Sequence, residues 1–550
     1  MREFWVVCRA ARVEHGPPPR TTRAPDVLRI ALLAASMAWV YLGLSPAITM
    51  EGILADGASH MLRNGSWTVP HLYGEIYSFK PPLGPWLVAA SFSLFGKSLW
   101  SLRLPFALCG ACAMVGTHLA LQRREGPRTA AWCAIAAGSG YLWIQKLRIA
   151  EVDVLLAATV GLSILAACLT LSSARPRASY WLMTYGLLAL GFMAKGVPAL
   201  LFFGPGLLVA AALVRKPKAL SAQPHVLGLS LGLLVPACTW ALLAWSESGG
   251  RVFEQPLQEG LQRSTEWTLG RLLQSLLTPL TVVGLFVPWS LYLPAALRAQ
   301  LRAEPGANPE QERAGFRAAL SGFVLAGIAV MMLMPATHAR YLLPLSLPVG
   351  VTVGLFLCAR GEQGSRRLNR CEGVGLGLLC AIAGGAAIAT GLGAFGVPLP
   401  APARVLALTS GSACIGAAYL TSLRRSIGRA AVAGVLLTVS LALWSLVCFG
   451  IDLRRAQVRS YDRTAASFAQ QVPEDASVWV DMDDDHSNLF FAMDRQVRRF
   501  EIAGSLPAPG SWLVLRDDQA AALAPGAAEL VQRSVDGRIR LGLWKVPRAR

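Results

Sequence analysis

Charged and aromatic side chains stand at the ends of several apolar segments that lie far apart in the sequence. The acidic ones are Glu51, Asp56 and Asp153, and the basic and aromatic ones are Lys80, Lys195, Arg263, Arg340 and Tyr341. Ionisable groups at a membrane boundary are costly, which makes them candidates for function. The cations could bind a phosphate and stabilise it as a leaving group, while a carboxylate takes the proton of an acceptor hydroxyl. These residue types therefore suit group transfer from an amphiphilic phosphate donor, whose lipid tail would lie between apolar helices.

Each of these side chains also has a structural interpretation. Lys80 could simply extend to the lipid headgroups, and Glu51 could cap a helix on the membrane surface. Asp153 could be the N-cap of its own helix. Lys195 and Tyr341 could be ordinary anchors at the membrane interface. A run of acids with one histidine, residues 481–486, could bind a divalent metal, but its spacing matches no standard calcium loop, which favours a solvated loop.

The composition indicates a membrane protein. Of the 550 residues, 54% are hydrophobic and 15% are charged, whereas soluble domains carry about 25% charged residues. Apolar runs of about 20 residues recur along the chain, which predicts a polytopic α-helical membrane protein. The net charge of +19 lies mainly in short connections, which favours topogenic charge beside anionic lipid over nucleic-acid binding. The eleven cysteines show no disulfide framework or zinc spacing and are interpreted as small apolar fillers.

The short apolar stretch 83–95 decides the topology. The basic residues of the segment 1–26 place the N-terminus in the cytoplasm. If 83–95 crossed the membrane, the basic run 122–128 would face outward. If 83–95 lies along the outer surface instead, that run is inside, and so are the later basic clusters near 175–177, 215–218, 298–317, 360–370 and 424–429. Because one assumption places six clusters on the cytoplasmic side, we predict a surface helix there.

This topology gives about thirteen transmembrane helices. They are expected near 27–48, 102–121, 129–146, 152–172, 179–195, 197–214, 225–246, 272–297, 318–336, 341–359, 373–397, 404–422 and 430–451. Residues 1–26 form a cytoplasmic tail, residues 27–451 the transmembrane domain, and its outer loop 49–100 the surface helices. The composition changes after residue 451, and the alternating segments 477–480 and 511–515 predict strands. Residues 452–550 are therefore expected to form a small α/β domain on the periplasmic side, with a helix near 465–471.

The outer loop carries a motif that resembles one known family. The segment 61–70, MLRNGSWTVP, is followed by GEIY at 74–77 and by KPPL at 80–83. Further matches are RLP at 103–105, GFMAKG at 191–196 and RYLLP at 340–344. In this order they resemble the bacterial lipid A aminoarabinose transferases, within the group of polyprenyl-phosphate-sugar-dependent enzymes that includes protein O-mannosyltransferases. The resemblance covers residues 45 to 345.

The resemblance implies a GT-C fold and inverting sugar transfer from an undecaprenyl-phosphate carrier at the periplasmic face. The family's Asp-Glu pair, whose Asp is held to be catalytic, aligns with Met50-Glu51, so that Asp is absent. An acidic metal ligand of close relatives aligns with Phe79. The Asp at the head of the fourth span, the Lys-Gly pair and the carrier-contacting Tyr match Asp153, Lys195-Gly196 and Tyr341. The scaffold therefore matches the family better than the expected chemistry does.

Three interpretations follow from the missing Asp. Glu51 substitutes for it, or Asp56 or Asp153 serves as the base, or the chain is an altered or inactive relative. We favour the first two. No residue is assigned as a metal ligand, and a divalent metal is left open as a cofactor.

The sequence thus predicts a polyprenyl-phosphate-dependent glycosyltransferase of the bacterial inner membrane, with a lipid, glycan or protein acceptor and no nucleic-acid partner. One rival is a transporter or flippase, which would show charges near mid-bilayer and a repeat between halves. The other is a non-catalytic relative that binds the lipid carrier.

Overall fold

The computed structural model describes residues 24–39, 42–43, 45–48, 50–77, 79–174, 176–254, 268–302, 309–334, 339–358, 370–396, 398–423, 429–454, 461–481, 486–502, 504–535 and 540–547. Within these residues, eight helices are long and apolar enough to cross a membrane. The chain is therefore a multi-pass, mostly helical membrane protein. The expected number of thirteen crossings stays a prediction.

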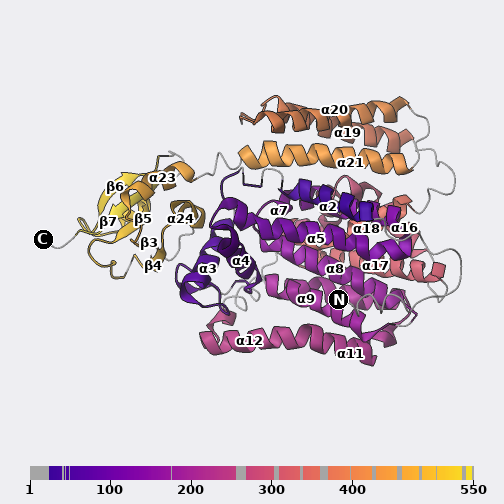
Figure 1. The fold of residues 1–550 in the computed structure, drawn as a ribbon, viewed down its shortest axis with the longest axis horizontal. Helices are drawn as coiled ribbons and strands as arrows, with labels where there is room; N and C mark the ends of the chain where they lie inside the picture. The colour runs from indigo at the N-terminus through magenta and orange to yellow at the C-terminus, as the bar shows by residue number, and fades with distance from the viewer. Residues whose placement is uncertain are drawn as a thin grey trace.

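The helix bundle is built around α8 (Val152–Ser172), which is 89% buried over its apolar window. It packs against α5 (Leu99–Glu125), α9 (Ala178–Lys195), α17 (Pro309–Leu333) and α18 (Ser346–Cys358). A layer of α19 (Arg370–Gly391), α20 (Ala401–Leu423) and α21 (Arg429–Ser445) flanks the bundle on one side. On the opposite side lie α11 (Gln223–Leu229) and α12 (Val235–Ser248), as Figure 1 shows. The remaining bundle helices are α2 (Ala24–Trp39), α6 (Pro127–Gly138), α7 (Tyr141–Leu147) and α10 (Pro198–Leu213).

Two of the expected spans are broken rather than continuous. The span expected over 129–146 is divided between α6 and α7 at Ser139-Gly140. The span expected over 272–297 consists of α14 (Leu269–Leu276), α15 (Thr278–Leu285), the 3₁₀ turn Trp289–Tyr292 and α16 (Leu293–Leu301). Pro279 and Pro294 lie in the first turns of α15 and α16, where the missing N–H does no harm. The same residues would break the interior of one long helix.

The loop after α2 forms a compact structure at one end of the bundle. It contains α3 (Glu51–Asn64), the antiparallel hairpin β1 (His71–Leu72) and β2 (Glu75–Ile76), and α4 (Leu83–Phe95). The thirteen residues of α4 extend about 20 Å, which is too short for a hydrocarbon core of roughly 30 Å. This length agrees with the expected place of α4 on the surface rather than across the membrane.

Residues 461–547 form an α/β unit with a five-stranded mixed sheet in the order β4-β3-β5-β7-β6. The strands are β3 (Val478–Asp481), β4 (Val497–Phe500), β5 (Trp512–Arg516), β6 (Glu529–Arg533) and β7 (Leu541–Lys545). Pairs β3–β4 and β3–β5 are parallel, and the others are antiparallel. The predicted strands correspond to β3 and β5, and the predicted helix to α23 (Asp462–Gln471).

The sheet shares its core with the loop after α2. Buried Phe468 of α23 and Phe490 of α24 (Ser487–Met493) belong to one apolar cluster with Ile53 of α3 and with Leu72 and Tyr73 of the hairpin. Figure 1 shows the sheet and α24 next to α3 and α4, at one end of the bundle. We call this end, which carries α3, α4 and the sheet, the loop face.

Candidate active site

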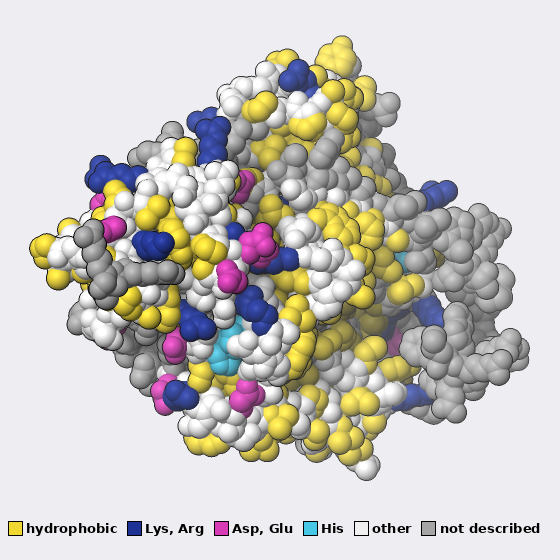
Figure 2. Space-filling model, turned by 60° about the vertical axis from the view of Figure 1, so that its left-hand side comes forward, with side chains coloured by type: hydrophobic (Ala, Val, Ile, Leu, Met, Phe, Trp, Pro, Cys, Tyr) yellow, Lys and Arg dark blue, Asp and Glu magenta, His cyan; other side chains and the backbone are white. Residues whose placement is uncertain are grey.

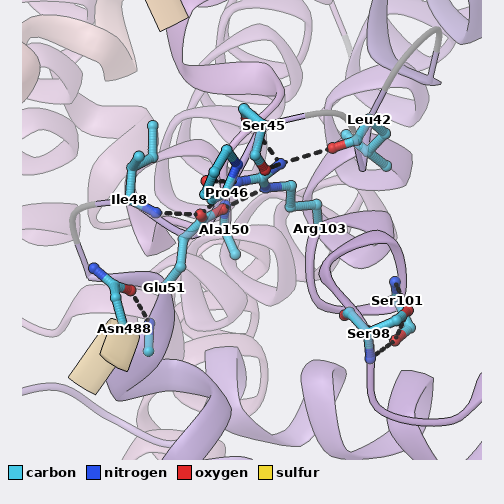
Figure 3. Close-up of polar contacts among 11 residues, drawn as sticks. Leu42, Ser45, Pro46, Ile48, Glu51, Ser98, Ser101, Arg103, Ala150 and Asn488 are labelled. Atoms are coloured by element: carbon cyan, nitrogen blue, oxygen red, sulfur yellow. Dashed lines mark hydrogen bonds and ion pairs between the residues drawn. The ribbon is translucent and has the colours of Figure 1, made fainter. Parts of the chain in front are cut away.

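Glu51 and Arg103 form a buried ion pair beneath the loop face (Figure 3). Arg103 Nε donates to Glu51 Oε1 at 2.7 Å, and Nη2 donates to Oε2 at 2.8 Å. Both side chains are at most 1% exposed. A capping box of Ser98 and Ser101 begins α5 and thereby fixes the turn that carries Arg103.

Backbone groups complete this cluster. The amides of Ile48 and Ala150 donate to the two oxygens of Glu51 at 2.9 and 2.8 Å. Arg103 also donates to the carbonyls of Leu42, Ser45 and Pro46 at 2.8 to 2.9 Å. The pair therefore joins the segment after α2, the start of α3 and the turn before α8, and Figure 3 shows the residues that contribute.

This geometry argues against Glu51 as the substitute base. A general base needs a lone pair within hydrogen-bond reach of the acceptor proton. The carboxylate of Glu51 accepts four hydrogen bonds and is fully buried. Glu51 supports the loop instead.

Asp56 lies on a different side of α3. Its Oδ2 accepts a hydrogen bond from the amide of Tyr73 at 2.8 Å. Burial raises the pKa of Asp56, and the hydrogen bond from Tyr73 and the charges of Arg63, Lys97 and Arg499 oppose this rise. Two of these lie close to the C-terminal unit, since Lys97 pairs with Asp494 and Arg499 belongs to β4. Asp56 therefore faces the C-terminal unit and not the remaining candidates.

Four of the predicted residues do converge, at the end of the bundle beneath the loop. Lys195 Nζ bonds to Asp153 Oδ1, and Arg340 Nε lies 4.0 Å from Asp153 Oδ2. Lys195 Nζ also lies 4.3 Å from the centre of the Tyr341 ring. Asp153 stands in the first turn of α8 and Lys195 in the last turn of α9, where the helix dipoles favour their charges. The 3₁₀ segment η5 (Ala339–Leu345) supplies Arg340 and Tyr341.

Lys80 lies beside this group. Burial lowers the pKa of Lys80 to about 8, with Asp153 opposing the shift and Lys195 adding to it. The loop around Lys80 reaches α9, because a Cβ on Gly196 would lie 3.8 Å from the Pro81 ring. No hydrogen bond or ion pair joins Lys80 to a residue that the structure describes. Among these residues, no carboxylate neutralises its ammonium by direct contact.

A second ion pair supports this cluster. Lys146 Nζ lies 2.6 Å from Glu151 Oε2, and Glu151 is 2% exposed. Glu151 also acts electrostatically on Lys80. Lys146 stands in the last turn of α7 and Glu151 directly before α8, and their spacing of five residues gives no local signal that they meet.

A small pocket adjoins Lys80 on the loop face. Its other lining residues come from α3, the hairpin and the start of α4: Met50, Ile53, Leu54, Gly57, Pro70, His71, Tyr77, Pro81 and Pro85. Figure 2 shows the loop face, where basic, acidic and histidine side chains gather between the sheet and the bundle. His71 was not among the predicted site residues, because a histidine before a two-residue strand has no distinctive sequence signal.

The residues that the structure describes do not form a metal site. Phe79 occupies the position where the family resemblance expects an acid, and its ring is 41% exposed. No group of three or more His, Cys, Asp or Glu side chains with metal-ligating geometry occurs in the described part of the chain. Arg263 and the acidic run 482–485 lie outside the described residues.

Known proteins resemble this chain in sequence. Residues 79–241 match the family described as dolichyl-phosphate-mannose-protein mannosyltransferase. The chain is 27% identical over 345 residues to an undecaprenyl phosphate-alpha-4-amino-4-deoxy-L-arabinose arabinosyl transferase of Pseudomonas aeruginosa, covering 58% of this chain. It is 28% identical over 397 residues to the protein of that name from Pectobacterium carotovorum, covering 66% of this chain and 64% of the relative. The match spans 57% of the length of the Pseudomonas relative.

The structural similarity extends over nearly the whole chain. The crystal structure of ArnT from Cupriavidus metallidurans bound to undecaprenyl phosphate superposes with a TM-score of 0.72 at 19% identity. The superposition covers 95% of this chain and 98% of the other. The apo structure of the same protein gives the same TM-score. The chain therefore has the ArnT-like GT-C glycosyltransferase fold, as the resemblance in its sequence predicts.

Proposed function

We propose that this chain is a glycosyltransferase that moves a sugar from a polyprenyl phosphate of the undecaprenyl class to a lipid acceptor in the bacterial inner membrane. The observation that carries the proposal is the convergence of Lys80, Lys195 and Arg340 at one end of an ArnT-like bundle. Three cations exceed the single carboxylate of Asp153, so this group has excess positive charge for an anionic phosphate. The names of the relatives support a carrier of this kind.

The reaction follows from this arrangement. The acceptor oxygen attacks the anomeric carbon on the face opposite the phosphate, and a new carbon–oxygen bond forms. The bond from the anomeric carbon to the phosphate oxygen breaks, and its electron pair leaves with the polyprenyl phosphate. Lys80, Lys195 and Arg340 stabilise that departing charge. Asp153 holds Lys195 and Arg340 in position, because its two carboxylate oxygens face these two cations.

The loop face is proposed to be periplasmic. Basic clusters that the topology expects in the cytoplasm meet at the opposite end of the bundle. Arg317 lies 2.7 Å from Glu125, and Lys216 donates to the carbonyls of Leu171 and Ser173 near the end of α8. A fusion of alkaline phosphatase after residue 547 is expected to be active, and an active cytoplasmic reporter at the same place would reverse the orientation.

A transfer assay tests the function. Purified protein is given a panel of undecaprenyl-phosphate sugars together with lipid A, and the products are identified by mass spectrometry. We expect transfer from at least one donor, with Lys80→Ala reducing it at least a hundredfold. The control is Lys97→Ala, which removes a cation of the same loop that pairs with exposed Asp494 instead.

Binding without transfer from any donor would support the non-catalytic relative. A flippase is not favoured, since the charges lie at one end of the bundle and the similar proteins carry transferase names. Lipid transport by the protein in vesicles, without sugar transfer, would overturn the proposal.

A further inference from the structure

Sugar transfer requires a group that accepts the proton of the acceptor hydroxyl, and the three candidate carboxylates are occupied elsewhere. Glu51 is buried against Arg103, Asp56 faces the C-terminal unit, and Asp153 is paired with cations. The pocket beside Lys80 offers a different kind of base. Of the ten residues that line it, His71 is the one with an imidazole, the side chain that most often serves as a general base in enzymes.

The hydrogen bonds of His71 determine which ring nitrogen carries the lone pair. Nδ1 lies 2.8 Å from the carbonyl oxygen of Val69. Because a carbonyl oxygen only accepts, Nδ1 must carry the hydrogen, which leaves the lone pair on Nε2. No described residue forms a hydrogen bond with Nε2. A positioned imidazole with one nitrogen bonded to the backbone is the arrangement of a general base.

A second histidine holds the ring in place. The rings of His60 and His71 are stacked, with centres 4.3 Å apart and planes inclined by 15°. Asn64 Nδ2 donates to His60 Nε2 at 2.8 Å and so orients the supporting ring. Burial, with His71 next to it, lowers the pKa of His60 to about 4. The supporting ring is therefore neutral near pH 7 and does not repel a proton that arrives on His71.

We propose that Nε2 of His71 accepts the proton of the acceptor hydroxyl as its oxygen bonds to the anomeric carbon. The electron pair of the breaking bond leaves with the carrier phosphate beside Lys80, so atoms and charges balance. This inference rests on the proposed function. It assigns the pocket between Met50, His71 and Lys80 as the place where the acceptor hydroxyl meets the donor.

The test compares His71→Asn with the full-length wild-type protein in the transfer assay. We expect kcat to fall by about 10²- to 10⁴-fold, as for loss of a general base. Binding of undecaprenyl phosphate should stay within about twofold, because the cations are untouched. Glu75→Gln is the matched control, since Glu75 is exposed on the facing strand of the same hairpin and should leave kcat unchanged.

Two rescue variants separate proton transfer from a structural role. Met50 lines the same pocket, so Met50→Asp combined with His71→Asn brings a new base to it and should regain at least tenfold. Imidazole added to His71→Ala should raise its rate in proportion to the concentration of neutral imidazole. A merely structural histidine would respond to neither change.

The outcomes are distinguishable. If the wild type transfers sugar and folded His71→Asn retains a third or more of its rate, this inference falls while the proposed function stands. If His71→Asn does not fold, failure of imidazole to rescue folded His71→Ala overturns the inference instead. If the wild type transfers sugar from no donor, both fall together.

Discussion

The ion pair between Glu51 and Arg103 leads to a prediction that separates support from catalysis. Glu51→Gln keeps the shape of the side chain but removes its charge and one acceptor oxygen. In the folded protein this oxygen accepts two of the four hydrogen bonds, and the other oxygen accepts the remaining two. The side-chain nitrogen of the glutamine is a donor, so two donors that now bond to a carboxylate oxygen would face another donor instead.

The magnitude follows from the burial of both partners. Arg103 is 1% exposed and would lose the carboxylate that compensates its charge. Removal of one partner from a buried ion pair costs about 3–5 kcal/mol, and each buried donor left without an acceptor costs about 1–3 kcal/mol. We therefore expect Glu51→Gln to lower the free energy of unfolding by about 3–5 kcal/mol, a large part of the roughly 5–15 kcal/mol of a typical protein.

The assay measures folding and transfer on the same samples. The free energy of unfolding is obtained by denaturant titration in detergent micelles, and hydrogen exchange of the segments 45–56 and 98–106 reports where the structure opens. Arg103→Met should have a similar effect. The double variant should cost clearly less than the sum of the two singles, because the charges are then removed together.

A matched rate measurement decides between the two roles. Per mole of folded protein at low temperature, Glu51→Gln should keep its transfer rate within about tenfold of the wild type. If the variant is as stable as the wild type and yet loses transfer by more than a hundredfold, Glu51 takes part in the chemistry and the structural role is refuted.

Three further predictions concern the cations and the contact with the C-terminal unit. Burial lowers the pKa of Lys80 to about 8, so its ammonium is present below that pH and lost above it, and the dissociation constant for undecaprenyl phosphate should rise roughly fivefold between pH 8 and pH 9. The variant Lys80→Arg should remove this pH dependence. If the rise persists in that variant, another group causes it. Asp153→Asn should lower the free energy of unfolding by about 3 kcal/mol, because Lys195 loses its buried partner. Adding Lys195→Met should restore part of this loss in the denaturant titration. An Asp153→Asn variant as stable as the wild type would contradict this prediction. Gly52→Ala should detach α24 from α3, because the added Cβ would lie 2.2 Å from the carbonyl carbon of Ser487. Unchanged hydrogen exchange across α24 would show that the contact between the two helices is not tight.

The sequence by itself determined the helical membrane class of the protein and the positions of several helices. Hydropathy over about 20 residues is a local property, so the spans over 152–172, 179–195 and 404–422 agree closely with α8, α9 and α20. The helix over 83–95 agrees with α4, and its place on the membrane surface stays a prediction from the sidedness of basic residues. The alternation of β3 and β5 likewise identified the C-terminal strands.

Hydropathy could not predict that two of the expected spans are broken. Residues 272–297 have the length and hydropathy of one continuous helix, and membrane proteins tolerate proline within helices. Whether Pro279 and Pro294 kink a helix or begin new ones depends on the neighbours that satisfy the freed carbonyls. In the structure, both prolines lie in the first turns of new helices.

Only the tertiary structure decided which acid meets which cation. Glu51 and Asp56 lie on one helix, five residues apart, and so point about 140° apart around its axis. Arg103, 52 residues away in the sequence, forms the ion pair with Glu51, while Asp56 faces the C-terminal unit. Asp153, Lys195 and Arg340 meet because the ends of α8, α9 and η5 lie at one level of the bundle. Side-chain direction depends on packing between remote segments, so no local pattern could separate a supporting carboxylate from one at the active site.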